Sequence, residues 1–206
     1  MSVQQPASEA RATFTDWMRA RFKGVLDPVA AFLNRLGLMP NTVTLIGLAG
    51  NLVGAYFLAR GFFLVGGLLV LVMGVIDALD GTMARLRGER SDFGAFVDSV
   101  TDRYSELLIF GGLLIFYSMH DNLWLAIMTF GAAAGSVLVS YVRSRAESLG
   151  FQAKVGLLTR MERYLVLAPS LLFGVTWFGI IVIAILGNAT ALQRILAVRR
   201  QARMEK

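Results

Sequence analysis

Long apolar runs constrain this chain more than any other feature of its sequence. Six such runs lie at residues 43–59, 62–79, 96–119, 123–141, 164–175 and 177–196. A helix that crosses a bilayer needs about 20 mostly apolar residues. The 206 residues are also 56% hydrophobic and only 17% charged, which is too little polar surface to cover a soluble globule. We therefore expect an all-α integral membrane protein with six transmembrane helices.

The positive charges are distributed in a way that predicts how these helices are oriented. All Lys and Arg except Arg60 and Arg103 precede the first run, end or follow the last, or lie in the connections after the second and fourth. Cytoplasmic segments of membrane proteins are enriched in Lys and Arg. Both termini are therefore expected in the cytoplasm, in a multi-pass protein of the plasma membrane. This topology accounts for the net charge of +6, so nucleic acid is not expected as a partner.

The residues before the first run predict a helix that lies on the membrane surface. Residues 14–38 mix apolar and basic side chains, as in an amphipathic helix in the headgroup plane. A helix that binds a soluble partner is the alternative. Pro40, Asn41 and Thr42 are typical of a helix start. We divide the chain into an amino-terminal segment (1–39), a six-helix membrane domain (40–198) and a basic tail (199–206).

Two pairs of glycines have a spacing that favours close packing of helices. Gly50 and Gly54, and Gly131 and Gly135, are each four residues apart, as in helix contacts through small residues. The sequence leaves open whether they pack helices within one chain or between two.

Carboxylates stand out where the second run ends and the third begins. The chain has no cysteine and one histidine, which excludes thiolate sites and sites with several imidazoles. Asp77 and Asp80 are three residues apart, and Asp98 and Asp102 are four apart, so each pair shares one helix face. The short connection lets both pairs meet at the cytoplasmic boundary of the membrane, where their repulsion calls for a cation.

The chemistry of these carboxylates indicates which cation they would bind and which ligand that cation would contact. Carboxylate oxygens suit Mg²⁺, Mn²⁺ or Ca²⁺, and protein-bound Mg²⁺ commonly contacts substrate phosphates. Gly81 and Gly94 would let a bulky headgroup approach, and Arg85 could neutralise phosphate charge. A diphosphate is therefore the implied ligand. The alternatives are helix capping and ion pairing in a structural or lipid-binding protein, or a pathway in a divalent cation transporter.

The segment from Asp77 to Asp102 resembles the signature of the CDP-alcohol phosphatidyltransferases. It reads D-x2-D-G-x2-A-R-x8-G-x3-D-x3-D, and every fixed position matches. The resemblance implies a homodimeric six-helix enzyme that transfers a phosphatidyl group from CDP-diacylglycerol to an alcohol and releases CMP at the cytoplasmic face. It implies that Asp77, Asp80, Asp98 and Asp102 hold one or two ions, Mg²⁺ or alternatively Mn²⁺, with Asp102 as general base.

The same resemblance implies which residues contact the nucleotide of the CDP-lipid. The expected positions are Gly81, Arg85 and Ser91, together with the stretch Asn41, Thr42, Val43 and Thr44. Capping of the first transmembrane helix is the alternative role of that stretch.

The connection after the fourth run is expected to bind the acceptor alcohol. Its cations suit an acceptor that carries a phosphate, and its sequence resembles that of prokaryotic phosphatidylinositol phosphate synthases. This resemblance implies inositol 1-phosphate as acceptor, held by Arg143, Arg145, Arg160 and Arg163. Arg143 departs from the pattern, in which Lys is common. Glycerol 3-phosphate, and so a phosphatidylglycerol phosphate synthase, is the alternative. Ester or ether lipid tails are both compatible with the sequence.

Overall fold

The computed structural model describes residues 14–88 and 91–204, and every regular element within them is a helix. The expected all-α fold is therefore confirmed for these residues. Arg11, Arg90 and Lys206, which entered the charge pattern, lie outside the described residues, as does all of the segment before residue 14. The helices are α1 (Phe14–Arg35), α2 (Pro40–Ala59), α3 (Phe63–Arg87), α4 (Asp92–Met119), α5 (Leu123–Ser148), α6 (Arg160–Leu172) and α7 (Thr176–Met204).

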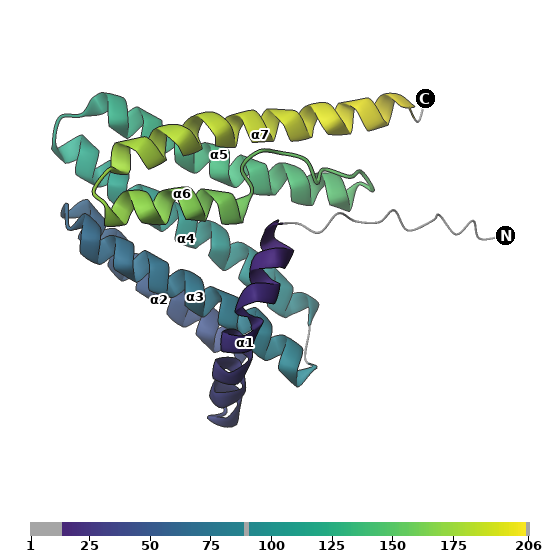
Figure 1. Ribbon diagram of the computed structural model, residues 1–206. Helices are drawn as coiled ribbons and strands as arrows, with labels where there is room; N and C mark the ends of the chain where they lie inside the picture. Colours follow the sequence, from purple (N-terminus) through teal and green to yellow (C-terminus); the bar gives the residue numbers. More distant parts are fainter. Residues whose placement is uncertain (1–13, 89–90, 205–206) are drawn as a thin grey trace.

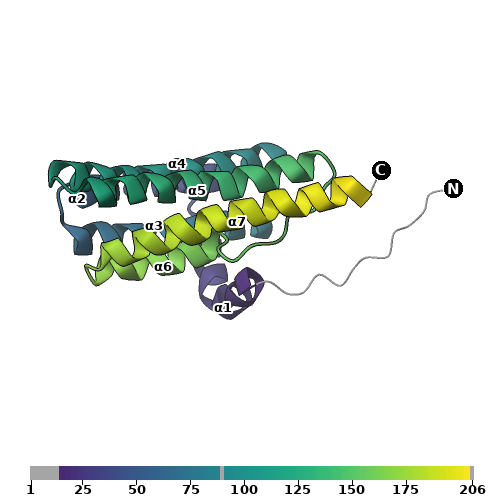
Figure 2. The same cartoon turned by 90° about the horizontal axis from the view of Figure 1, so that it is seen from above.

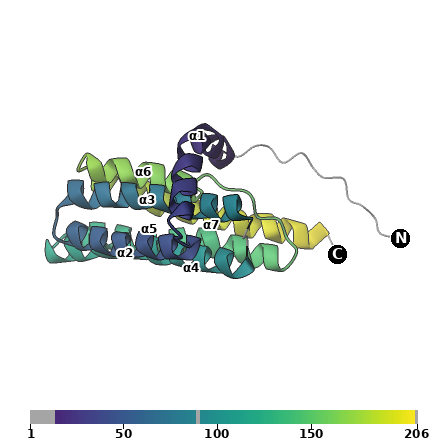
Figure 3. The same cartoon turned by 90° about the horizontal axis from the view of Figure 1, so that it is seen from below.

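Six of the helices form a bundle of two layers, and α1 lies across one of them. Helices α2, α4 and α5 make one layer and α3, α6 and α7 the other, as Figures 2 and 3 show from opposite sides. The layers meet through contacts of α2 with α3 and of α5 with α7. Helix α1 packs on α3 at a steep angle to the bundle (Figure 1).

Four helices are long and apolar enough to cross a membrane: α2, α3, α5 and α7. Only 33% of the apolar window of α3 is buried inside the molecule. So much outward-facing apolar surface is typical of contact with lipid, and the protein is a membrane protein.

The other two expected spans are helical but differ from these four. Helix α4 has 28 residues, and its first half carries several charged side chains. Helix α6 has 13 residues, or about 20 Å, against about 30 Å for the hydrocarbon core. Residues 151–159, which precede it, form no helix. The described structure thus supports four spans by length and composition, and a crossing by all six helices stays a prediction.

The glycine pairs pack helices within this chain. A Cβ atom on Gly50 would meet Met73 of α3, and one on Gly54 would approach Leu69 and Val70. Likewise, a Cβ atom on Gly135 would lie 2.7 Å from the Asn188 side chain of α7. Both spacings are therefore explained by contacts inside one protomer.

Helix α1 is amphipathic in an unusual way, because two of its faces are apolar. One face packs Leu26, Ala30 and Leu33 against α3. On another, Phe22 and Phe32 belong to an exposed apolar stripe. An unpartnered stripe of this kind suits the expected position at the membrane surface, which stays a prediction.

Candidate active site

Three of the four motif carboxylates come together between the two layers. Asp77 projects from α3, and Asp98 and Asp102 project from α4. One ligand oxygen of each lies within 4.8 Å of those of the others. Asp102 is buried. Hard oxygens at this spacing fit a divalent cation, so the residues suit the ion that the motif implies.

The fourth carboxylate, Asp80, faces the start of α2. Its Oδ2 accepts a hydrogen bond from Thr44 Oγ1 at 2.5 Å, and both side chains are buried. Asp80 is outside the group of three. The contact explains how the start of α2 reaches the motif, although Thr44 and Asp80 are 36 residues apart.

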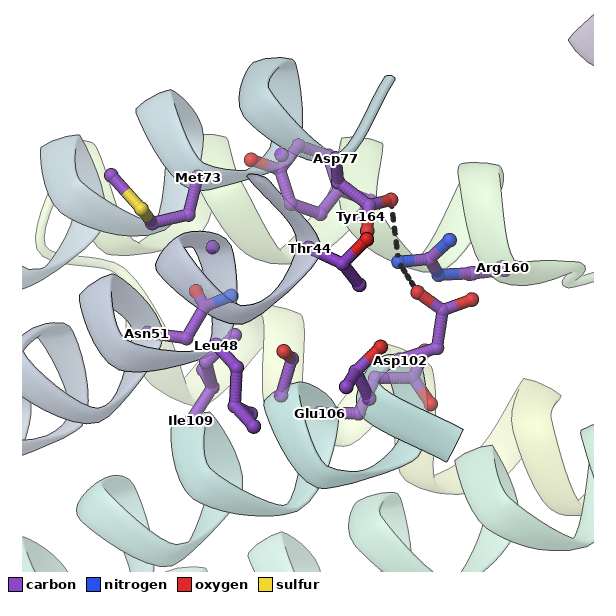
Figure 4. A pocket seen from close by; sticks show the side chains of 14 residues that line it. Thr44, Leu48, Asn51, Met73, Asp77, Asp102, Glu106, Ile109, Arg160 and Tyr164 are labelled. Atoms are coloured by element: carbon purple, nitrogen blue, oxygen red, sulfur yellow. Dashed lines mark hydrogen bonds and ion pairs between the residues drawn. The ribbon is translucent and has the colours of Figure 1, made fainter. Parts of the chain in front are cut away.

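A guanidinium group holds the carboxylates of the two layers together. Arg160, the first residue of α6, pairs with Asp77 Oδ2 at 2.9 Å and also with Asp102 Oδ1 (Figure 4). Arg103 pairs more loosely with the other oxygen of Asp102, at 3.4 Å. Arg160 was expected in the acceptor pocket, and the structure places its side chain against the motif carboxylates.

A second ion pair lies one helical turn deeper in the bundle. Arg163 Nη2 is 2.6 Å from Glu106 Oε1, and the Arg163 side chain is only 3% exposed. Arg163 also donates to the carbonyl of Leu158. That Arg163 binds the acceptor stays a prediction. Its guanidinium is enclosed by these partners. It positions α6 against α4.

The residues expected around the nucleotide lie near the ends of α2, α3 and α4. Gly81 has a free face, since only Arg85 comes within 4.0 Å of a Cβ atom built on it. Arg85 donates to Thr82 Oγ1 at 2.6 Å. Ser91 caps α4 by accepting from the Gly94 amide. Their common position at one end of the bundle is compatible with one ligand.

The stretch at the start of α2 is mixed in character. Thr42 is exposed and Asn41 is half-buried, whereas Val43 packs in the small core between α1 and α3. The Val43 side chain therefore contributes packing. Pro40 begins α2, as the sequence predicted.

The exposed cations of the expected acceptor pocket lie at the end of α5. Arg143 pairs with Glu147 one turn later, at 2.9 Å, and Arg145 is exposed. Among the residues that the structure describes, no ion pair joins either of them to the motif carboxylates. A phosphate near this end would have cations available from α5.

A pocket opens beside the carboxylates and extends between α2, α3, α4 and α6 (Figure 4). Asn51, whose buried Oδ1 has no hydrogen-bond partner, and Tyr164, whose hydroxyl donates to the Val70 carbonyl, contribute to its lining. Thr101 and Ser105 line it from the same face of α4 as Asp102. The sequence interpretation missed these four. Only the two on α4 could have been found, from their three-residue spacing to motif carboxylates.

Arg194 is a further buried cation that the sequence interpretation assigned only to the basic end of the chain. It is 3% exposed and donates to the carbonyls of Val139 and Val155. These bonds tie α7 to α5 and to the segment before α6. The sequence interpretation grouped Arg194, which lies near the end of the last apolar run, with the exposed Arg199, which follows that run.

Comparisons with known proteins agree with this geometry. Residues 37–193 match the sequence model of the CDP-alcohol phosphatidyltransferase family. The chain is 38% identical to phosphatidylinositol phosphate synthase of Streptomyces avermitilis, over 93% of this chain and 85% of that protein.

Solved structures of phosphatidylinositol phosphate synthase from Mycobacterium tuberculosis have the same fold. One with CDP-DAG bound has a TM-score of 0.80 and 30% sequence identity, and the match covers 85% of this chain and 94% of that one. Another, in complex with manganese and citrate, has a TM-score of 0.78 and 31% identity, covering 84% and 88%.

Proposed function

The chain belongs to the CDP-alcohol phosphatidyltransferase family, and on this premise we propose that it makes phosphatidylinositol phosphate. It is a membrane transferase of phospholipid synthesis. The proposed reaction moves the phosphatidyl group of CDP-diacylglycerol to a hydroxyl of inositol 1-phosphate and releases CMP. A mycobacterial relative whose structure holds CDP-DAG supports the donor, and relatives that are phosphatidylinositol phosphate synthases support the acceptor.

The observation that carries the proposal is the convergence of Asp77, Asp98 and Asp102 from two layers of the bundle. We propose that these three, with Asp80, bind one or two divalent ions. Binding of a divalent metal is supported by the oxygen donor set and by a relative that binds manganese. Mg²⁺ is the proposed ion. When bound, it would draw negative charge from the diphosphate of the lipid donor.

Asp102 is the proposed general base. It lies at the junction of the pocket with the carboxylate group, where an acceptor hydroxyl can reach it. The hydroxyl gives its proton to Asp102, and its oxygen forms a bond with the phosphorus that carries diacylglycerol. The bond from that phosphorus to the bridging oxygen breaks, and CMP leaves with the bond's electron pair.

Substrate positioning is proposed for the residues around this centre. Gly81, Arg85, Ser91 and the stretch Asn41–Thr44 would hold the CDP end of the donor. Arg143, Arg145 and Arg160 would hold the acceptor phosphate through charge-assisted hydrogen bonds. Arg163 would contribute indirectly, by fixing α6 through Glu106.

We further propose that α2–α7 all cross the plasma membrane, with both termini and the site on the cytoplasmic side. The cations near the site and at the end of α5 support this orientation. The acyl chains then stay in the bilayer while CDP and the acceptor phosphate face water. A homodimer is the proposed assembly.

The test is CMP release by purified protein from CDP-diacylglycerol with Mg²⁺ and inositol 1-phosphate, with glycerol 3-phosphate offered in parallel. Asp102→Asn should lower kcat by at least about 100-fold, since general-base catalysis contributes about 10²–10⁴. Asp121→Asn is the matched control, because Asp121 lies in an exposed turn with φ 53°, a conformation that Asn tolerates.

Two outcomes would contradict the proposal in different ways. Full activity of Asp102→Asn would refute the role of Asp102. A preference for glycerol 3-phosphate would keep the transferase and its site but change the acceptor, making the enzyme a phosphatidylglycerol phosphate synthase.

A further inference from the structure

Arg160 contacts the carboxylates that the proposed metal also needs. A single nitrogen of its guanidinium, Nη2, pairs with Asp77 of α3 and with Asp102 of α4. Both belong to the group whose ligand oxygens lie within 4.8 Å of one another. The guanidinium thus provides the positive charge that this carboxylate group requires when no ion is bound.

The carboxylates, and not the helix, keep Arg160 in place. A cation at the first position of a helix is unfavourable, because the amide groups there carry partial positive charge. The Arg160 side chain is 45% exposed, so solvent already reaches it on one side. Once an ion binds Asp77 and Asp102, the Arg160 side chain can turn away from these carboxylates toward solvent.

Other contacts hold α6 without help from Arg160. Arg163 pairs with Glu106 in the interior, and the Tyr164 hydroxyl donates to the Val70 carbonyl of α3 at 2.5 Å. The backbone of α6 can therefore stay fixed while the Arg160 side chain changes partners.

We propose that Arg160 and the divalent ion compete for Asp77 and Asp102, so that binding of the ion displaces the guanidinium. Both cations need the same carboxylates, and their own charges repel each other at this range. The displaced guanidinium stays at the edge of the site, where it can pair with a phosphate. Ion binding thereby converts Arg160 from a partner of the carboxylates into a partner of an anion.

This exchange couples the two ligands, and that consequence rests on the proposed function. If phosphate stabilises the displaced position of Arg160, then phosphate must strengthen binding of the ion, and the ion must strengthen binding of phosphate by the same factor. The acceptor would then bind well only after the ion is in place.

The competition is tested by measuring Mn²⁺ affinity of the protein in lipid nanodiscs by electron paramagnetic resonance, without any substrate. Arg160→Gln should bind Mn²⁺ about tenfold more tightly or better, since it removes the charge-assisted contact that competes with the ion. Arg199→Gln removes the same charge from an exposed site on α7 and should change the affinity less than about twofold.

Two further measurements cover the case in which Arg160→Gln is unstable without metal. Its melting temperature should rise more on Mn²⁺ addition than that of the wild type. Arg160→Lys keeps the positive charge on a more strongly hydrated ammonium group, so it should compete less well and bind Mn²⁺ more tightly than the wild type by a smaller factor. Unchanged or weaker Mn²⁺ binding in both Arg160 variants would overturn the competition.

The coupling is tested by calorimetry with inositol 1-phosphate, with and without Mn²⁺ and without lipid donor. Mn²⁺ should tighten inositol 1-phosphate binding in the wild type and not in Arg160→Gln, and equal tightening in both would overturn the coupling. Failure of the transferase proposal is distinct from either result. A protein that shows the Mn²⁺ competition but releases no CMP refutes the transferase alone.

Discussion

Acidic side chains of α4 and basic side chains of α6 lie opposite one another inside the bundle. Helix α4 presents Asp98, Asp102 and Glu106 at four-residue spacing along one face, and α6 presents Arg160 and Arg163 toward it. Burying a charge without a partner costs several kcal/mol. The two arginines therefore compensate the acidic face of α4, one at the rim of the site and one below it.

The buried pair gives a residue-scale prediction. Glu106→Gln would leave Arg163, which is 3% exposed, without its carboxylate partner, and should destabilise the protein by about 3 kcal/mol. The measurement is unfolding in mixed micelles with a denaturant series.

A double-mutant cycle supplies the control for this prediction. Arg163→Met added to Glu106→Gln should recover part of the loss, because it removes the unpaired charge and keeps an apolar side chain. The free energies of unfolding lost in Glu106→Gln and in Arg163→Met are compared with the loss in the double variant. If the two single losses simply add, Glu106 and Arg163 do not stabilise the fold as a pair.

At the scale of the helices, close contacts through glycine set how the layers pack. Gly112 of α4 faces α2 so closely that a Cβ atom on it would lie 2.3 Å from the Ala55 carbonyl oxygen. Neither backbone can yield without moving a helix. Since α2 carries Thr44 and α4 carries Asp102, this contact also governs the width of the site.

The glycine contact predicts opposite effects for two adjacent substitutions. Gly112→Ala should force α2 and α4 apart, lowering the melting temperature and reducing activity at least tenfold, since small displacements at a site have large effects. Gly111→Ala is the matched control, because nothing lies within 4 Å of its added Cβ. It should be neutral or stabilising by about 0.5–1 kcal/mol.

Melting curves of the two variants in the same detergent, together with CMP release, make this comparison. An equal fall in melting temperature for both would mean that the α2–α4 contact does not limit packing.

At the scale of the whole molecule, the proposed topology predicts on which side of the membrane each helix end lies. The natural chain has no cysteine, so a single introduced thiol reports the side on which it lies. Ser118 and Ser148 are exposed near the carboxyl ends of the antiparallel helices α4 and α5, and Val175 lies between α6 and α7. These positions distinguish the proposed topology from its alternatives.

Labelling with a membrane-impermeant maleimide in intact cells tests that topology. Ser118→Cys and Val175→Cys should react without permeabilisation, and Ser148→Cys only after it, because the cations around α5's end retain that end in the cytoplasm. Protection of Val175→Cys in intact cells would show that the short α6 does not bring the chain to the outer side.

The sequence by itself determined the helical class, the membrane setting and the identity of the carboxylate motif. Apolar runs predict helices because a bilayer leaves backbone groups no partners except their own. The Asp motif was readable because helical periodicity places residues three and four apart on one face. Both are local properties of the sequence, so they can be recognised without knowing which helices pack together.

Only the tertiary structure decided which charges meet. The sequence placed Arg160 and Arg163 together in one acceptor pocket, whereas the fold directs one to the motif carboxylates and buries the other beside Glu106. It also set the pairing of Thr44 with Asp80, the burial of Arg194 and the length of α6. Each depends on residues between 36 and 83 positions apart or on how layers pack, because charge pairing in a low-dielectric interior follows distance in space and not spacing along the chain.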